Sequence, residues 1–250
     1  MSGSEQQSYG TIVVVGGGCY GSYYVRQLRR AAEAGKLSWD RLVAVDRDPA
    51  CRLARSPELL APVAAAPAPE VVVDDWRAYF APAIRSCGAR DTIVPSPLMP
   101  HLMVGWVMDE VRARWPSRAV GLKALQQELP VPWQLANGDA PHYASFATWT
   151  CPVNCIEPAR CPHTREARDW SMPRAMEGYV AARRAAGDSL DGPLLFHCEH
   201  RAFGVGMFET MRVREAGETV VRAAERGAAD FLIGTVSHCH GALARLVIGG

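Results

Sequence analysis

The sequence predicts an α/β protein built on a mostly parallel, doubly wound sheet, and three observations support this prediction. Short β-branched runs alternate with helix-like periodicity through the first part of the chain. The same alternation returns between about residues 193 and 236. A Cys- and Pro-rich stretch that shows neither period separates the two parts. We therefore expect residues 1–125 and 191–250 to share one sheet, interrupted by an irregular insert at residues 126–190.

The individual elements follow from these periods. In the first part we expect strands at residues 11–15, 41–45, 71–73 and 91–94 and helices at residues 22–34, 74–87 and 102–115. Further along we expect a helix near residues 172–186, strands at residues 193–196 and 230–236, and between these strands a helix from about residue 207 to 226. No element is expected over most of residues 128–174, because the Pro, Trp, Asn and His residues there follow no period.

Composition and charge exclude several classes of protein. The 250 residues include 27 Lys and Arg against 26 Asp and Glu, a net charge of +1, so nucleic acid and anionic membranes are not expected partners. No apolar run reaches the roughly 18 residues of a membrane span, and residues 1–10 lack the pattern of a secretion signal. We therefore expect a cytoplasmic protein whose eight cysteines serve metal or redox chemistry instead of disulfides.

A glycine-rich turn follows the first predicted strand at once. The segment Gly16-Gly-Gly-Cys-Tyr-Gly21 contains the pattern Gly-x-Gly-x-x-Gly and leads into a predicted helix. In such a turn Gly16 allows the tight bend, Gly18 lets a pyrophosphate approach the backbone, and Gly21 lets the helix pack against the strand. The first amides of the helix, including those of Cys19 and Tyr20, then face the phosphates, whose negative charge the helix dipole favours.

This stretch resembles the NAD(P)-binding Rossmann superfamily over about residues 10–100. The resemblance implies a Rossmann-like fold in which Asp46, at the end of the second strand, binds the adenosine ribose. A carboxylate there favours NAD, whereas the neighbouring Arg47 leaves NADP open, and FAD is a further alternative. In this superfamily the loop after the fourth strand reaches the nicotinamide, which makes Ser96 and His101 positional candidates. Two other interpretations stay open: S-adenosylmethionine in the same turn, and a turn that binds no ligand.

Three cysteines form a compact array in the second half of the chain: Cys151, Cys155 and Cys161, spaced as Cys-x3-Cys-x5-Cys. Two of them precede Pro, and the surrounding stretch has no other evident source of order, so we expect a metal to organise it. The array resembles the cluster-binding loops of ferredoxin-like proteins, although its spacing matches neither common ferredoxin pattern. The resemblance implies an iron–sulfur cluster, with a 4Fe–4S cluster as the first choice, and zinc or metal-free thiols as alternatives.

Two further groups of residues offer a fourth ligand. Phe196-His-Cys-Glu-His200 and Ser237-His-Cys-His240 each follow a predicted strand, where open α/β sheets place their sites. We expect Cys239 to be the fourth ligand because histidines flank it on both sides, and Cys198 is the alternative. The histidines of both groups are candidate acid–base residues: His197, His200, His238 and His240.

A dinucleotide and a cysteine-bound metal in one chain indicate electron transfer. The leading hypothesis is a cytoplasmic oxidoreductase, or the electron-transfer subunit of one, in which a flavin bridges hydride and single-electron steps if FAD fills the nucleotide site. The alternatives are a redox or nucleotide sensor, an accessory subunit without catalysis, and a zinc-containing NAD(P)-dependent dehydrogenase. A redox partner protein and self-association into a homo-oligomer are the expected protein contacts.

Overall fold

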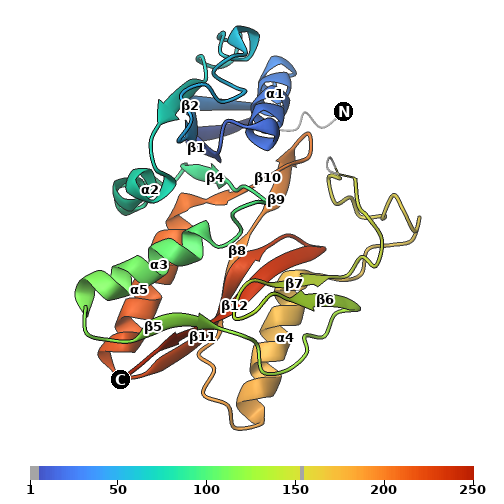
Figure 1. Cartoon of the computed structure of the whole chain (residues 1–250). Helices are drawn as coiled ribbons and strands as arrows, with labels where there is room; N and C mark the ends of the chain where they lie inside the picture. The colour runs from blue at the N-terminus through green and yellow to red at the C-terminus, as the bar shows by residue number, and fades with distance from the viewer. Residues whose placement is uncertain (1–5, 153–154) are drawn as a thin grey trace. The chain divides into compact units, whose positions relative to one another are not determined.

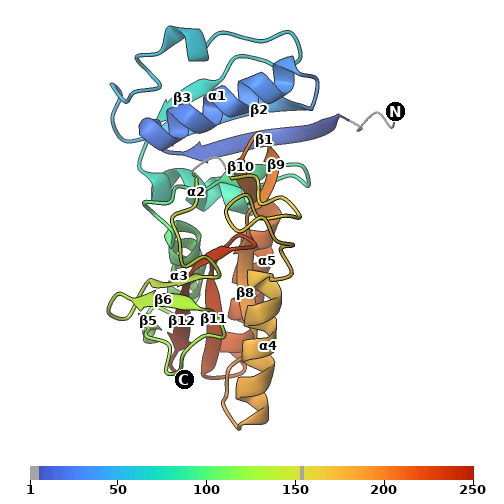
Figure 2. The same cartoon turned by 90° about the vertical axis from the view of Figure 1, so that its right-hand side faces the viewer.

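A computed structural model describes residues 6–152 and 155–250 of the chain (Figure 1, Figure 2). The chain forms two compact units. Unit 1 contains the chain up to Met99 together with Glu199–Arg212, and unit 2 contains Pro100–Cys198 and Val213–Gly250. Each unit is therefore assembled from two separate segments of the chain.

Unit 1 is a mixed sheet with two α-helices. Its elements are β1 (Gln7–Val15), α1 (Cys19–Glu33), β2 (Leu37–Asp46), the 3-10 helix η1 (Pro57–Leu59), β3 (Glu70–Val73), α2 (Trp76–Arg85), β4 (Thr92–Val94), β9 (Glu199–Ala202) and β10 (Val205–Glu209). The strands lie in the order β3-β2-β1-β4-β10-β9. The first four are parallel, whereas β10 is antiparallel to both β4 and β9. Every strand and helix expected before residue 95 is present.

The core of unit 1 lies between its sheet and α1. Ile12 and Val14 of β1 are fully buried, and they pack in one cluster with Val25 on the apolar stripe of α1. Figure 2 shows α1 lying along β1 and β2. At Gly21 the helix packs against the turn that follows β1: a Cβ atom there would lie 1.8 Å from the carbonyl oxygen of Gly16. Only glycine fits at this position, and this contact sets where α1 begins.

Unit 2 holds the second mixed sheet. Its elements are α3 (Leu102–Arg114), β5 (Val120–Lys123), β6 (Trp133–Ala136), β7 (His142–Ser145), α4 (Met172–Ala185), β8 (Pro193–His197), the larger part of α5 (Thr210–Glu225), β11 (Ala229–Val236) and β12 (His240–Ile248). The strand order is β6-β7-β12-β11-β8, and β5 also pairs with β12. The β11–β8 pair is parallel, and the other pairs are antiparallel.

Helix α4 covers one face of this second sheet (Figure 1). Met172, Met176 and Val180 recur at helical spacing and are buried. They pack in one cluster with Leu232 of β11 and Leu243 of β12. The hairpin of β11 and β12 is therefore held on one side by α4.

The expectation of a single sheet completed by residues 191–250 is wrong. β8 and β11 do pair in parallel, but they pair in the second sheet, beside the antiparallel β12. Periodicity identifies a strand, yet it carries no information on which sheet the strand joins. The protein is therefore mixed α/β with two mixed sheets, and residues 191–250 contribute strands to both.

Two local expectations also differ from the structure. The helix expected from about residue 207 begins at Thr210, because Val205–Glu209 forms β10 in a hairpin with β9. Phe203 and Gly204 form the two-residue turn of this hairpin, with positive φ values of 42° and 80°. Within the stretch expected to be irregular, β6 and β7 form a second hairpin that pairs with β12.

Within residues 6–152 and 155–250, none of the helices combines the length and the apolar character that crossing a bilayer requires.

The contact at Gly21 generates a stability prediction. Gly21→Ala should lower the free energy of unfolding by about 3 kcal/mol, because the added methyl group overlaps the Gly16 carbonyl and the backbone must shift. Gly18→Ala is the matched control: its Cβ would meet nothing within 4 Å, so a change within about 1 kcal/mol is expected. Urea denaturation followed by circular dichroism measures both values. Equal stability of the two variants would contradict the close packing of α1 on β1.

Candidate functional site

The glycine-rich turn of unit 1 has a backbone conformation that its residue types explain. Gly16 has a φ of +89°, in the left-handed region, and its N–H donates to the Val45 carbonyl at 2.9 Å. The N–H of Gly17 donates to Asp46 Oδ2 at 2.6 Å. The turn after β1 is therefore bonded directly to the end of β2.

Asp46 and Arg47 each have partners within unit 1. Besides the contact with the glycine turn, Asp46 accepts the N–H of Asp48 on Oδ1 at 2.9 Å. A carboxylate oxygen accepts two hydrogen bonds, so each oxygen of Asp46 has a further lone pair for a ligand. Arg47 forms an ion pair with Asp75, and its guanidinium carbon lies 4.7 Å from the ring centroid of Trp76. The side chain of Arg47 is therefore held at the start of α2.

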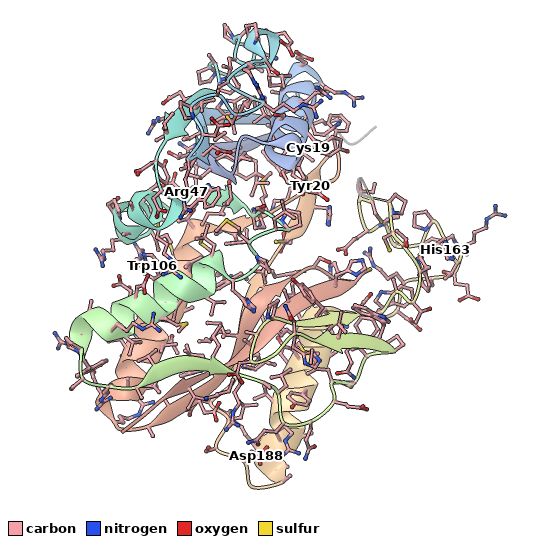
Figure 3. The ribbon with its side chains drawn as sticks, in the orientation of Figure 1. Cys19, Tyr20, Arg47, Trp106, His163 and Asp188 are labelled. Atoms are coloured by element: carbon pink, nitrogen blue, oxygen red, sulfur yellow. The ribbon has the colours of Figure 1, made fainter. Side chains whose placement is uncertain are left out.

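The amino-terminal end of α1 lies beside open space. Gly18 immediately precedes the helix, and a Cβ atom there would meet nothing within 4 Å. The first N–H groups of a helix have no acceptor inside the helix, and here they belong to Cys19, Tyr20 and Gly21. Figure 3 shows Cys19, which is exposed, and Tyr20 at this end of the helix. An anionic ligand would find both N–H donors and the positive end of the helix dipole there.

Ser96 and His101 follow β4 in the chain but belong to different units. Ser96 lies in unit 1, where its Oγ accepts the N–H of Leu98 at 3.3 Å. His101 lies in unit 2 and directly precedes α3. Burial lowers the pKa of the His101 imidazole, which is therefore uncharged at neutral pH. A role of these two residues beside a nicotinamide stays a prediction.

The Ser-His-Cys-His group of unit 2 forms the tight turn between β11 and β12. The N–H of Ser237 donates to the His240 carbonyl at 2.7 Å. The hydroxyl oxygen of Ser237 accepts the N–H groups of Cys239 and His240 at 3.3 and 3.2 Å. The sequence predicts Cys239 after the end of a single strand. In the structure it lies in a turn between two paired strands, β11 and β12, and both strands fix its position.

A buried carboxylate that the sequence analysis missed binds this turn. Glu157 lies in the Cys-rich stretch, is only 8% exposed and has a φ of +46°. Its Oε1 accepts the Ser237 hydroxyl at 2.6 Å and the Cys239 N–H at 3.1 Å. Its Oε2 accepts the N–H of His238 at 3.0 Å. The sequence offers one weak signal, an acid between two clustered cysteines, and an acid in a polar loop is normally solvated.

Two aromatic residues complete the surroundings of Cys239. The indole N–H of Trp170 donates to the Cys239 sulfur at 3.3 Å, and the Trp170 ring stacks on Phe146 with centroids 6.1 Å apart. The N–H of Phe146 donates to the Cys239 carbonyl at 2.9 Å. Burial, assisted by the negative charge of Glu157, raises the pKa of the Cys239 thiol to about 12. This thiol is therefore protonated at neutral pH, although the charge of Arg168 acts against the increase.

Cys151 and Cys161 of the cysteine array lie in different electrostatic environments. Burial first, and then the charges of Cys155 and Cys161, raise the pKa of the Cys151 thiol. Cys161 differs, because backbone N–H groups, above all that of Thr164, stabilise its thiolate and lower its pKa. His163, labelled in Figure 3, belongs to the same stretch.

The candidate histidines are divided between the units. His197 and His238 lie in unit 2, with their rings edge to face and their centroids 4.9 Å apart. His240, in the same unit, has its Nδ1 3.0 Å from the Ser145 hydroxyl oxygen. His200 belongs to β9 of unit 1, where its Nδ1 lies 3.2 Å from the carbonyl oxygen of Gly204.

The predicted metal ligands are not gathered into a coordination sphere. Among residues 6–152 and 155–250, no three His, Cys, Asp or Glu side chains are arranged to hold a metal ion. Cys198, the alternative ligand, is buried, and its N–H donates to the Val236 carbonyl at 2.7 Å. Burial first, and then the charge of Glu157, raise the pKa of the Cys198 thiol. The metal site therefore stays a prediction, which rests on the residue types and their spacing.

The fold and these residues define a two-unit α/β protein with a cysteine-rich stretch bound to a hairpin turn in its second unit. Residues 103–249, more than half of the chain, match the AF_1314_C family, described as "Uncharacterized protein, C-terminal domain". The chain belongs to this family. No curated protein and no solved structure matches the chain.

The thiol environments generate a prediction for the metal-free protein. At about pH 7, Cys161 should react with iodoacetamide faster than Cys151, Cys198 and Cys239, because only its pKa is lowered and the thiolate is the reacting form. As the pH rises, the rate at Cys161 should level off while the rate at Cys239 still increases. Mass spectrometry of tryptic peptides measures each rate, and urea-unfolded protein, in which the rates converge, is the control. Fastest labelling of Cys239 would contradict the assigned environments.

Proposed function

We propose that this protein is a dinucleotide-binding oxidoreductase, or the electron-transfer subunit of one, whose second unit holds a metal through cysteines. The observation that carries the proposal is the glycine-rich turn, with a left-handed Gly16, open space beside Gly18 and close packing at Gly21. These are three different steric demands, and together they are the demands of a turn that receives a pyrophosphate. A turn that only connects a strand to a helix does not need the open space at Gly18.

The strand order of unit 1 supports a ligand at this place. β1 has β2 and β3 on one side and β4 on the other, and all four strands are parallel. The strand order therefore reverses at β1. Open α/β sheets bind ligands at the carboxyl ends of their strands where such a reversal occurs, and the glycine-rich turn follows β1 at that end.

NAD is the dinucleotide that we propose first. Asp46 lies beside the turn with lone pairs for the ribose hydroxyls, and its charge disfavours a 2′-phosphate. NADP would need a cation beside its 2′-phosphate. Arg47 is the cation next to Asp46 in the sequence, and it is already paired with the carboxylate of Asp75. FAD, which lacks the 2′-phosphate, is the alternative that the same contacts allow. A bound dinucleotide supplies two-electron chemistry, and the chain contributes phosphate donors at the start of α1 and the ribose acceptor.

For the metal we propose an iron–sulfur cluster held by four thiolates, those of Cys151, Cys155, Cys161 and Cys239, with Cys198 and zinc as alternatives. The support is the spacing of the three clustered cysteines, and the charge of Glu157 acts on the thiols of Cys151 and Cys239 and on that of the alternative ligand Cys198. A metal deprotonates the thiols that bind it, which would offset the raised pKa of Cys151 and Cys239. A cluster would supply single-electron transfer.

A zinc-containing NAD(P)-dependent dehydrogenase is the second candidate. The observation that favours it is the edge-to-face pair of His197 and His238, next to Cys239 in the hairpin turn. An imidazole there is an acid–base group suited to neutral pH. A sensor or accessory subunit would use the same two sites and would differ in lacking turnover of NAD(P)H with an artificial acceptor.

The nucleotide site is tested by a branched side chain at Gly18. Gly18→Val should weaken NAD binding by at least about 100-fold, because its side chain fills the space in which the pyrophosphate approaches the backbone. The fold should persist, since nothing lies within 4 Å of the new Cβ. Calorimetric titration with NAD, NADP and FAD measures the effect. Gly121→Val, at an equally open position in β5, is the control, and unchanged affinity in Gly18→Val would refute the site.

The metal is tested by single serine substitutions. Cys151→Ser, Cys155→Ser, Cys161→Ser and Cys239→Ser should each lose most of the metal, because a hydroxyl is a much poorer ligand than a thiolate. Cys19→Ser and Cys87→Ser, in unit 1, should keep it. Iron, zinc and sulfide are measured per chain after anaerobic purification, with absorbance near ~400 nm separating a cluster from colourless zinc. Full occupancy in the first three variants would show that these cysteines are ordinary reduced thiols.

A further inference from the structure

Unit 1 contains a cavity of about 430 Å³, and all the residues that line it belong to this unit. The cavity lies on the face of the sheet opposite to α1. Side chains alternate along β1, so Ile12 and Val14 pack against α1, whereas Thr11 and Val13 point to the other face, on the side of α2 (Figure 2). Small-molecule sites have volumes of roughly 300–1,000 Å³, and this cavity falls within that range. It is separate from the glycine-rich turn, which leads into α1.

The cavity is open because the part of α2 that lines it carries short side chains. Ala78 and Pro82 are four residues apart and therefore lie on one face of the helix, and Ala83 lies beside them. These side chains are too short to fill the space between the helix and the sheet. The apolar floor consists of Val13 and Phe80, which are 5% and 1% exposed. A ligand of this cavity therefore needs an apolar body.

A buried hydroxyl in the lining lacks a partner. Thr210 is only 4% exposed, and its Oγ1 has no hydrogen-bond partner among residues 6–152 and 155–250. Its N–H donates to the carbonyl oxygen of Asp91 at 2.9 Å, so the backbones of these two lining residues are joined. Buried polar groups normally have a partner, because an unpaired one has lost its bonds to water. The hydroxyl of Thr210 therefore points to a polar group bound in the cavity.

The positive charge in the lining is already paired. Arg41 donates to both carboxylate oxygens of Glu70, at 3.3 and 2.8 Å. Tyr79 also lines the cavity, and burial raises the pKa of its hydroxyl, which is therefore uncharged at neutral pH. The lining thus offers little positive charge to an anionic ligand.

Two carboxylates in the lining accept backbone N–H groups. Asp91 accepts the N–H of Thr11 on Oδ1 at 2.7 Å and that of Gly88 on Oδ2 at 2.8 Å. Asp74 accepts the N–H of Asp75 on Oδ1 at 2.7 Å. Within the described ranges, 6–152 and 155–250, neither carboxylate forms an ion pair. Each carboxylate oxygen has two lone pairs, so both side chains can accept further hydrogen bonds, and their charges favour a cation.

We propose that this cavity binds a small primary amine, with its ammonium group beside Asp91 and Thr210 and its apolar body on Val13 and Phe80. An ammonium group has three N–H donors and one positive charge, which suit the carboxylate of Asp91 and the hydroxyl oxygen of Thr210. The proposal does not depend on the dinucleotide or on the metal of the proposed function.

The ligand class is tested by titrating the full-length chain with three probes of the same ring size: benzylamine, benzyl alcohol and benzoate. Benzylamine should bind with a Kd of about 1 mM or below, the level expected of a fragment of this size in a fitting site. The alcohol and the acid should each bind at least about tenfold more weakly, because only the amine carries the positive charge. Nuclear magnetic resonance locates the site, since the amide signals of Thr11, Tyr79 and Thr210 should shift with benzylamine.

The contacts are tested by variants that leave the sheet intact. Thr210→Val removes the hydroxyl and keeps the shape of the side chain, so it should weaken benzylamine at least about tenfold without lowering the urea midpoint, because this hydroxyl has no partner among the described residues. Thr219→Val is the matched control in α5: it loses a hydrogen bond to the Glu215 carbonyl and should leave benzylamine affinity unchanged. Asp74→Asn should weaken benzylamine and leave benzyl alcohol unchanged, because it removes only charge.

A third variant tests the space itself. Ala83→Leu should abolish the benzylamine shifts by filling the cavity, whereas Ala181→Leu, at an exposed position of α4, should leave them as in wild type. Circular dichroism confirms that each variant is folded. Absence of benzylamine shifts in the wild-type chain would show that the cavity holds water only and would overturn the proposal. Benzoate binding as tightly as benzylamine would overturn the choice of an amine, and equal affinity of Thr210→Val and wild type would overturn the role of Thr210.

Discussion

The missing side chain at Gly21 is the constraint on which the glycine-rich turn of unit 1 depends. It lets α1 begin directly against the carbonyl of Gly16, which bends the chain into the left-handed region there. That bend points the next N–H at Asp46 and so ties the turn to the end of β2. The three features are coupled through the backbone, with no long side chain involved. The shape beside Gly18 is therefore set before any ligand arrives, and binding need not pay the cost of ordering this loop.

Each unit has a turn or helix end at which several backbone N–H groups lie close together. The two sites differ in what lies next to these groups. In unit 1 the N–H groups at the start of α1 lie beside the open space at Gly18. In unit 2 those of the β11–β12 turn are bound by Glu157. The same electrostatic preference for an anion thus has two uses in one chain. In unit 1 the groups are left beside open space, and in unit 2 they fasten a cysteine-bearing loop to a sheet.

The sequence predicted what is local and missed what is distant. The strands and helices before residue 95 follow from β-branched runs and helical spacing, because these patterns lie within each segment. The assignment of β8 and β11 to a second sheet, and of His200 to a different unit from His197, depends on pairing between distant segments, which leaves no periodic signal. The expected helix includes residues 207–209, which belong to β10, because the turn at Phe203 gives no clear periodic signal. Glu157 escaped notice because its importance comes entirely from a turn 80 residues away.

The segment Glu199–Arg212 has a consequence for the order in which the chain can fold during synthesis. Its strands β9 and β10 finish the sheet of unit 1, although about a hundred residues of unit 2 precede them in the chain. Until β10 leaves the ribosome, β4 is an open edge with unpaired N–H and C=O groups. The amino-terminal half therefore spends much of translation as an unfinished sheet, and it cannot mature as an independent first domain. An open edge can pair with other strands, and β4 limits this because it is only three residues long and lies between Asp91 and Pro95.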